Sequence, residues 1–119
     1  RGERSNEALY GGAYRNRFQV LGDIVHSSPV YSHGMLYAGG NDGMLHAFDA
    51  ASGDERFAYV PNLVFGNLTS LIDPEYSHKY YVDLSPAIRD ITIGGLAKTY
   101  LVGGLGKGGK GYYALDVTD

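Results

Sequence analysis

The sequence contains neither cysteine nor tryptophan, and its charges nearly balance, with a formal net charge of -3. The lack of cysteine excludes disulfides, thiolate chemistry and Cys-ligated metals, but it does not identify the cellular compartment. The near balance of charge gives no electrostatic reason to expect nucleic acid or an anionic membrane as a partner. The sequence also lacks an apolar run of the roughly 20 residues that cross a bilayer, so we expect no membrane-spanning segment.

Glycine and tyrosine are abundant instead, with 18 and 11 residues among 119. Hydrophobic residues make up 44% of the chain and charged residues 19%, a composition that supports a packed core rather than disorder. A chain of this length forms one domain at most. Because glycine turns separate short segments rich in Tyr, Val and Ala, the composition predicts an all-β protein with short strands.

Residues 28–61 predict a four-stranded antiparallel meander. Asn41-Asp42-Gly43 is the strongest turn signal, because these residue types accept the positive φ angles of tight hairpin turns. Asp49 and Gly53 mark another turn, in which the Asp carboxylate accepts hydrogen bonds from backbone N–H groups ahead of it. Pro61 ends the last strand. The expected strands are residues 28–32, 35–39, 44–50 and 55–60.

Both faces of this meander are expected to be buried. Side chains alternate in direction along a strand, and neither set on the third strand is polar in the way that a solvated face requires. The two sets are Leu45, Ala47 and Asp49 on one side and Met44, His46 and Phe48 on the other. A sheet covered on both sides by similar sheets fits this pattern better than a sandwich does.

The pattern occurs twice in the chain. Three pairs of segments correspond: "VHSSPV" (25–30) with "VDLSPA" (82–87), "LYAGG" (36–40) with "LVGG" (101–104), and "HAFDAAS" (46–52) with "YALDVTD" (113–119). The step between units is 57 residues at Ser28 and 67 residues at Asp49. The additional residues fall in a hairpin around 93–98 and in the Gly-rich run 104–111. Repeats of a four-stranded unit with insertions confined to turns are typical of a β-propeller.

The repeat divides the chain into four parts: a lead-in (1–24), a complete blade (25–61), an inter-blade insertion (62–81) and an incomplete second blade (82–119). In the insertion, the spacing of apolar residues predicts a short helix near 62–72 that ends before Pro74. In the lead-in, "RFQVLG" (17–22) is expected to add a strand to a neighbouring blade. Because a propeller has four to eight blades, we expect a partial propeller from a longer protein. Its open strand edges and uncovered sheet faces predict that the isolated chain self-associates.

The run "GGLGKGGKG" (103–111) resembles phosphate-binding loops. Gly104, Gly106 and Gly109 follow the order of a dinucleotide-binding motif, and the run nearly satisfies the P-loop pattern. Both motifs need a following helix whose N-terminal N–H groups meet the phosphates. A strand-like segment follows here, and a glycine stands where the P-loop needs a hydroxyl. We therefore expect a mobile hairpin loop, on which Lys107 and Lys110 meet an anionic partner only weakly.

No catalytic, cofactor-binding or metal-binding residue is predicted, and residues that bind a ligand or partner stay unassigned. The histidines lack the i, i+4 spacing of a helical zinc site, and the aspartates do not form the calcium-loop pattern. These residues are His26, His33, His46 and His78, and Asp23, Asp42, Asp49, Asp83 and Asp116. We expect His46 to pack between blades, and Asp49 and Asp116, at the same repeat position, to stabilise turns.

Two further patterns have simple interpretations. Asn67-Leu68-Thr69 is a formal glycosylation sequon, which we interpret as a chance match. Tyr76, Tyr80 and Tyr81 fit either a recognition surface or packing within and between blades, and packing is the simpler interpretation.

The phrase "YAGGNDGMLHAFDAASG" (37–53) resembles the blades of PQQ-type quinoprotein propellers, in which a Gly-x-Leu-x-Ala-x-Asp string precedes a Gly turn. Phe57 stands near the position where those blades usually carry Trp. A closer resemblance covers nearly the whole chain. "RGERSNE", "LGDIVHSSPV", "NDGMLHAFDAASGDERFAYVP", "YSHKYYVD" and "LVGGLGKGGKGYYALDVTD" are similar in order and spacing to the PilY/PilC family of type IV pilus biogenesis proteins.

This resemblance implies a large secreted, periplasmic or cell-surface protein with a C-terminal β-propeller, which supports pilus assembly, opposes retraction and acts as a tip-associated adhesin. It implies pilus or pilus-assembly proteins and host or abiotic surfaces as partners, and no enzymatic activity. Where the family usually has Asp-Gly-Ser-Pro, this chain has Asp83-Leu84-Ser85-Pro86. The Asp-rich calcium loop and the N-terminal adhesive region of the family have no counterpart in these residues, so calcium is expected only elsewhere in the parent protein.

Three hypotheses about function follow. The first is a non-enzymatic structural and binding module of a pilus-associated propeller. The second is part of a quinoprotein-like dehydrogenase that uses PQQ and calcium, against which the absence of Trp counts. The third is a generic propeller that binds sugars or peptides, which the sequence leaves open.

Overall fold

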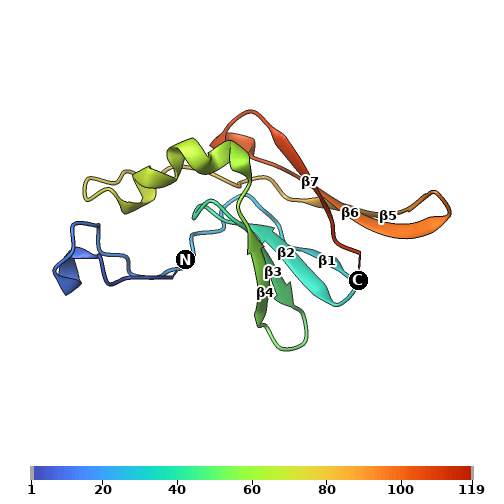
Figure 1. Cartoon of the computed structure of the whole chain (residues 1–119), viewed down its shortest axis with the longest axis horizontal. Coiled ribbons are helices and arrows are strands. Elements are labelled where there is room, and N and C mark those ends of the chain that lie inside the picture. Colours follow the sequence, from blue (N-terminus) through green and yellow to red (C-terminus); the bar gives the residue numbers. More distant parts are fainter. Residues whose placement is uncertain (1, 119) are drawn as a thin grey trace.

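Two antiparallel sheets joined by a helical segment make up the computed structural model, which describes residues 2–118 (Figure 1). The sheets are ordered β1-β2-β3-β4 and β5-β6-β7. The strands are β1 (Val30–Ser32), β2 (Met35–Gly39), β3 (Leu45–Asp49), β4 (Glu55–Tyr59), β5 (Ala87–Ile93), β6 (Leu96–Gly104) and β7 (Tyr112–Asp116). The 3-10 helices are η1 (Ala8–Tyr10), η2 (Asn62–Ile72) and η3 (Gly106–Gly108). The predicted all-β class, the four-stranded meander and the helix at 62–72 are confirmed.

The predicted lead-in begins at Arg1, and the predicted second blade ends at Asp119. Both of these residues lie outside the described residues. Within residues 2–118, no helix has the length and apolar character to cross a membrane.

Turn chemistry produces the hairpins where the sequence predicts them. At the β1–β2 turn, His33 and Gly34 have φ angles of 46° and 78°, the left-handed conformation of a tight primed turn. Asp49 closes the β3–β4 turn, because its Oδ1 accepts hydrogen bonds from the N–H groups of Ala51 (2.9 Å) and Ser52 (3.1 Å). Asp116 accepts a bond from the Thr118 N–H at 3.0 Å in the same way. The predicted turn role of both aspartates is confirmed.

The strand registers of the two sheets show that they are copies of one unit. In the first sheet Tyr31 lies opposite Leu36, and Leu36 lies opposite Phe48. The corresponding partners in the second sheet are Ile88, Leu101 and Leu115. A one-residue slip would turn every side chain to the other face, so this agreement confirms the repeat at the level of individual side chains.

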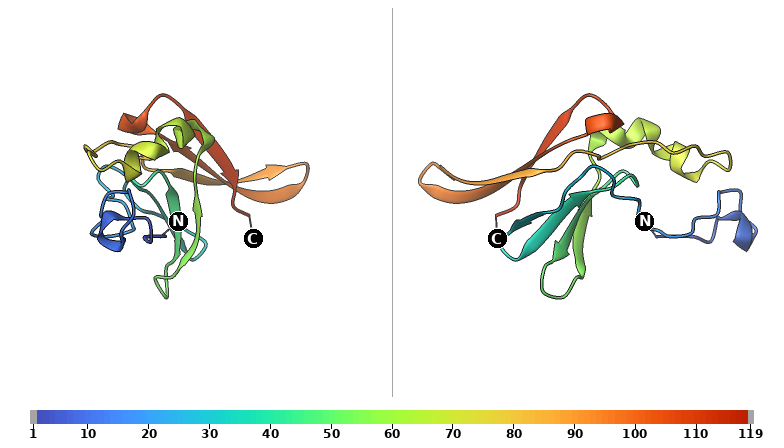
Figure 2. Two further views of the ribbon diagram at one scale, coloured as in Figure 1. Left: turned by 60° about the vertical axis from the view of Figure 1, so that its left-hand side comes forward. Right: turned by 180° about the vertical axis from the view of Figure 1, so that it is seen from behind.

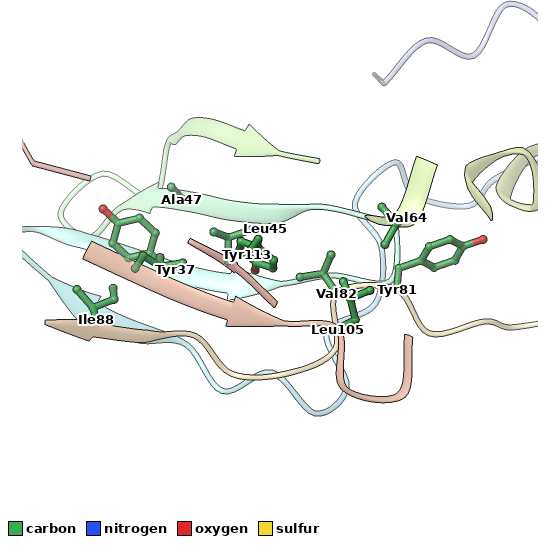
Figure 3. Close-up of a cluster of buried hydrophobic side chains, with 10 residues drawn as sticks. Tyr37, Leu45, Ala47, Val64, Tyr81, Val82, Ile88, Leu105 and Tyr113 are labelled. Atoms are coloured by element: carbon green, nitrogen blue, oxygen red, sulfur yellow. The ribbon is translucent and has the colours of Figure 1, made fainter. Parts of the chain in front are cut away.

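The core lies between the two sheets, which pack face to face (Figure 3). Tyr37, Leu45 and Ala47 of the first sheet form one side of this core, and side chains of β5, β6 and β7 form the other. The ring centroids of Tyr59 and Tyr113 are 5.5 Å apart across the interface. On β3, Leu45 and Ala47 are buried against the second sheet, and His46 is buried on the opposite face, where Asp42 and Glu55 contact its ring. The predicted cover by a sheet is therefore seen on one face only among the described residues.

Helix η2 is a 3-10 helix and packs on the turn between β2 and β3. Val64 is buried, and the Tyr81 hydroxyl donates a hydrogen bond to the Asn67 carbonyl at 2.8 Å. The helix ends at Ile72, before Pro74, as predicted. In Figures 1 and 2 the helix lies at one end of the sheets, beside the loop that precedes β7.

The lead-in forms a separate lobe that is stabilised by ion pairs (Figure 2). The buried Glu7 carboxylate accepts hydrogen bonds from Arg17 Nε (2.7 Å) and Arg4 Nη2 (3.1 Å). Arg15 ties the lobe to η2, because its backbone N–H donates to the Ile72 carbonyl and its guanidinium lies 3.9 Å from the Tyr76 ring.

The lead-in differs from the prediction in one respect. Residues 17–22 form no strand in the described chain, so the added strand expected there is wrong for this structure. The Gly22 N–H donates to Asp42 Oδ2 at 2.8 Å, and this side-chain bond replaces a strand ladder.

We predict that acid weakens the lead-in lobe. Burial raises the pKa of the Glu7 carboxyl, but bonds from Arg4 and Arg17 outweigh it and lower this pKa from 4.5 to about 2. The depressed pKa stabilises the lobe fully above pH 4.5, and the contribution is lost as the pH falls toward 2. Near neutral pH, proteolysis of the lead-in should therefore be slower in the unmodified chain than in the Glu7→Gln variant. The two should converge near pH 2, and a gap that persists there would contradict this account.

A second prediction concerns the contact between the sheets. A Cβ on Gly39 would lie 2.2 Å from the Val82 carbonyl oxygen, so Gly39→Ala forces the backbones apart. We expect a loss of about 1–3 kcal/mol in the free energy of unfolding, measured by chemical denaturation. Gly66→Ala in η2 is the matched control, because a Cβ there meets nothing within 4 Å and should not destabilise the protein. Equal effects of the two substitutions would refute the close approach.

Candidate functional site

Each of the four histidines contacts a carboxylate. The pairs are His26 Nδ1–Asp83 (2.7 Å), His33 Nε2–Asp90 (3.0 Å), His46 Nε2–Asp42 (3.0 Å), His46 Nδ1–Glu55 (2.7 Å) and His78 Nε2–Asp23 (2.8 Å). Two of these pairs join the two sheets. Of the aspartates that the sequence analysis set aside, Asp23, Asp42 and Asp83 contact histidines. Asp49 and Asp116 instead pair with Arg56 and Lys98. Within residues 2–118, no group of three or more His, Asp or Glu side chains is placed to hold a metal.

The contacts between the sheets follow one rule. His26 and Asp83, Ser28 and Ser85, and His33 and Asp90 are each 57 residues apart, so each pair joins the same position of the two repeats. The Ser28 N–H donates to Ser85 Oγ at 2.8 Å. These residues flank or lie on β1 and β5, the first strands of the two sheets, which contact each other, so the contact joins equivalent positions.

The His26–Asp83 pair combines a buried carboxylate with an exposed imidazole. The Asp83 side chain is 3% exposed and the His26 side chain 44%. Asp83 Oδ2 holds the ring through Nδ1, whereas Oδ1 has no hydrogen-bond partner within the described part of the chain. Buried carboxylate oxygens are usually hydrogen-bonded, to protein or to ordered water.

Tyr80 connects this pair to a second one. Its ring centroid lies 5.5 Å from that of His26 and 4.9 Å from that of His78. Lys107 Nζ, from the Gly-rich loop, lies 5.2 Å from the Tyr80 ring centroid, within the range of a cation–π contact. We call His26, His78, Tyr80 and Lys107, with Asp23 and Asp83 behind them, the His–Tyr surface.

Carboxylates orient both imidazoles of the His–Tyr surface. Partial burial raises the pKa of the Asp23 carboxyl, but hydrogen bonds from His78 and Asn41 outweigh this and hold the pKa below its usual value. At the other inter-sheet pair, bonds from Thr99 and then His33 lower the pKa of Asp90. Both imidazoles remain 44% exposed.

A pocket of about 380 Å³ adjoins the His–Tyr surface. Arg15, Asp23, Tyr76 and His78 are among its lining residues, so it offers an aromatic ring and charges of both signs. This arrangement suits recognition of a polar segment of another molecule. Its lining residues among positions 2–118 include no serine, threonine or cysteine.

The Gly-rich loop connects β6 and β7 of the second sheet as a hairpin loop. The three-residue helix η3 is followed by strand β7, as the sequence analysis expected. A Cβ on Gly108 would lie 1.9 Å from the Tyr81 carbonyl oxygen, so the loop packs directly on the chain before the second sheet. Lys107 reaches the Tyr80 ring and Lys110 is exposed.

The three tyrosines of the insertion have different roles. Tyr81 is buried in the core, and burial raises the pKa of its phenol. Tyr76 stacks with Arg15, and Tyr80 lies in the His–Tyr surface. Asn67 of the sequon is exposed on η2, and its carbonyl accepts the Tyr81 hydroxyl. The sequence analysis missed the His–carboxylate pairs. The 57-residue repeat step contained the signal, since it aligns His26 with Asp83 and His33 with Asp90.

Comparisons with known proteins agree with this architecture. The model of a family described as "PilY1 beta-propeller domain" matches residues 27–119. A type IV pilus biogenesis factor PilY1 homolog of Xylella fastidiosa is 41% identical over 149 aligned residues, which cover 100% of this chain and 12% of the relative. The type IV pilus biogenesis factor PilY1 of Pseudomonas aeruginosa strain PAK is 39% identical, with 100% of this chain and 13% of the relative covered.

A solved structure is similar as well. The crystal structure of the Pseudomonas aeruginosa PilY1 C-terminal domain has a TM-score of 0.53 and 46% sequence identity, covering 71% of this chain and 16% of that one. The chain therefore spans about an eighth of the length of the two pilus biogenesis factors, 12% and 13% respectively. These matches give no support to the quinoprotein dehydrogenase hypothesis.

We predict that the buried His26–Asp83 pair couples the sheets more strongly than the exposed His33–Asp90 pair. The two pairs have the same chemistry and sequence separation but differ in exposure. The side chains of His26 and Asp83 are 44% and 3% exposed, whereas those of His33 and Asp90 are 56% and 67% exposed. A double-mutant cycle with Ala at each position should give a coupling of about 1 kcal/mol for the first pair. The second should be smaller because exposed pairs are screened. Couplings of equal size would show that burial of Asp83 is irrelevant.

Proposed function

Because the chain belongs to the PilY1 β-propeller domain family, we propose that it is a non-enzymatic structural and binding module of a type IV pilus biogenesis factor. The main support for this proposal is the family match over residues 27–119. In this fold, the buried strand side chains pack between the sheets. In such a fold the loops and the inter-sheet rim remain available to partners. The role proposed for the parent protein includes pilus assembly, opposition to retraction and attachment to surfaces.

Three further features belong to the proposal. The partners are pilus or pilus-assembly proteins, together with host or abiotic surfaces. The location is the periplasm and then the cell surface, in association with the pilus. No cofactor is held by these residues, and a calcium site, if the parent has one, lies in another part of it. The absence of tryptophan and the lack of a nucleophile–base arrangement at the His–Tyr surface support a binding role over a catalytic one.

Self-association of the isolated chain is also proposed. Strand β7 lies at the edge of the second sheet, and among the described residues no strand pairs with its outer edge. Unpaired strand edges and exposed apolar sheet faces favour association with other chains.

The test uses a full-length pilus factor in a piliated bacterium. Replacing its equivalent region with this chain should preserve surface pili, whereas deleting the region should reduce pili, twitching motility and attachment. The deletion is also made in cells whose pili cannot retract. Surface pili should return in these cells if the region opposes retraction, and should stay absent if the region is needed for assembly. The matched control is the replacement that carries Gly66→Ala, expected to be neutral. A deletion with normal pilus number, motility and attachment would refute the proposed function.

A further inference from the structure

The turn between β2 and β3 holds the end of the lead-in on the first sheet. The Gly22 N–H donates to Asp42 Oδ2 at 2.8 Å, and the Asn41 N–H donates to the Asp23 carbonyl at 3.0 Å. A Cβ on Gly22 would lie 2.3 Å from the Asp42 backbone nitrogen, so the lead-in backbone lies directly against the turn. Because the family match begins at residue 27, this contact joins the segment before the matched domain to the domain itself.

His46 lies behind the Asp42 carboxylate, between two acidic side chains. Its Nε2 is 3.0 Å from Asp42 Oδ2, and its Nδ1 is 2.7 Å from Glu55 Oε1. The His46 side chain is 1% exposed, and those of Asp42 and Glu55 are 11% and 26% exposed. A buried imidazole is thus in contact with a carboxylate at each of its two nitrogens.

These two contacts favour one protonation state of the ring. A neutral imidazole has one N–H donor and one bare nitrogen, which is an acceptor, whereas an ionised carboxylate can only accept. With a neutral His46 ring, one carboxylate would therefore face a nitrogen lone pair. The doubly protonated ring donates to both carboxylates at once, and such charge-assisted hydrogen bonds are stronger than neutral ones.

The surroundings of the ring are otherwise uncharged. The cross-strand neighbours of His46 are Ala38 on β2 and Ala58 on β4, and the Phe48 ring stacks on the imidazole with a centroid distance of 5.8 Å. A hollow of about 400 Å³ lies beside the ring, between the lead-in and the first sheet. The titratable side chains that line it among positions 2–118 are those of Asp42, His46 and Glu55. These three side chains therefore determine the proton balance of the site.

We propose that His46 is a pH-sensitive latch, whose doubly protonated ring fixes Asp42 and thereby docks the lead-in on the first sheet. The docked form holds the second ring proton more firmly than the undocked form, because only docking keeps both carboxylates in place around the ring. Docking therefore strengthens as the pH falls from about 8 to about 5.5, within the range in which histidine changes charge, and weakens as the pH rises.

A second imidazole acts on the same segment with less effect. His78 Nε2 is 2.8 Å from Asp23 Oδ2, and the two side chains are 44% and 52% exposed. Arg15 and Arg17 line the pocket beside His78, so their positive charges oppose protonation of this ring. Because solvent screens an exposed pair, this contact contributes less to the pH dependence than the buried His46 does.

This inference goes beyond the proposed function. It concerns how the lead-in is held on the first sheet and does not depend on a role in pilus biogenesis. A hydrogen-exchange experiment and a piliation experiment therefore fail independently.

The test measures amide hydrogen exchange of residues 17–24 by mass spectrometry, in the full-length protein that contains this chain. Exchange is followed at pH 5.5 and pH 8, and each rate is corrected for the intrinsic pH dependence of amide exchange. Protection should be about tenfold greater at pH 5.5, because the charge-assisted bonds to both carboxylates are made only by the doubly protonated ring.

The deciding variant is Glu55→Gln. The Gln amide can donate to the bare nitrogen of a neutral ring, so protection should be kept and should differ by less than about twofold between the two pH values. Asp90→Asn is the matched control, because it makes the same change from acid to amide at the exposed His33–Asp90 pair. It should keep the pH dependence of the unmodified protein.

Three exchange results would overturn the proposal. Protection in the unmodified protein that does not fall between pH 5.5 and pH 8 excludes the latch. An unchanged pH dependence in Glu55→Gln assigns the effect to another group. Loss of protection in Glu55→Gln at both pH values shows that the amide does not replace the proton.

A further measurement needs no variant. Nitrogen NMR of the unmodified protein with labelled histidine should show His46 doubly protonated at pH 5.5, and the ring should lose one proton over the pH range in which protection falls. A singly protonated His46 ring at pH 5.5 would also overturn the proposal.

Discussion

The packing of one sheet face on another is the constraint on which the rest of the structure depends. Tyr37 and Leu45 on one side and Leu101 and Tyr113 on the other form one buried cluster between the sheets. Glycine at position 39 permits the approach, because any side chain there would meet the Val82 carbonyl. Once the faces are apposed, equivalent positions of the two repeats become neighbours. The three pairs separated by 57 residues are a consequence of this packing and not its cause.

The same constraint decides where chemistry is available. Strand side chains are used for packing, so polar groups that can meet other molecules lie on loops and at the rim between the sheets. There the buried Asp83 fixes one imidazole, Asp23 fixes another, and Tyr80 and Lys107 complete a surface of rings and charges. Such a surface suits protein or ligand recognition, in agreement with a family whose named members are pilus biogenesis factors. The outer face of β5–β7 is mixed, since the exposed Val102 and Tyr112 share it with Arg89 and with the Lys98–Asp116 ion pair.

Local sequence signals were sufficient to predict the strands and turns. They were not sufficient to predict which residues far apart in the sequence would contact each other. Asn41-Asp42-Gly43 and the Asp49 turn predicted the first sheet, and the repeat extended the prediction to β5–β7. The helix at 62–72 followed from apolar spacing, although its 3-10 form did not. The strand expected at 17–22 does not form, because Asp42 captures the Gly22 N–H. The His26–Asp83 and His33–Asp90 pairs join residues 57 positions apart, and the packing of one repeat on the other brings them together. The repeat implied that rotation without specifying which side chains would touch.

The central claim is that the two sheets are successive blades that meet through equivalent positions. An experimental structure of the chain, alone or within its parent protein, tests it most directly. The account predicts that the Tyr59 and Tyr113 rings touch across the interface and that His26 Nδ1 hydrogen-bonds Asp83, with Ser28 bonded to Ser85 in the same view. Sheets that pack through other faces, or residues 57 positions apart that lie on opposite sides of the molecule, would contradict it.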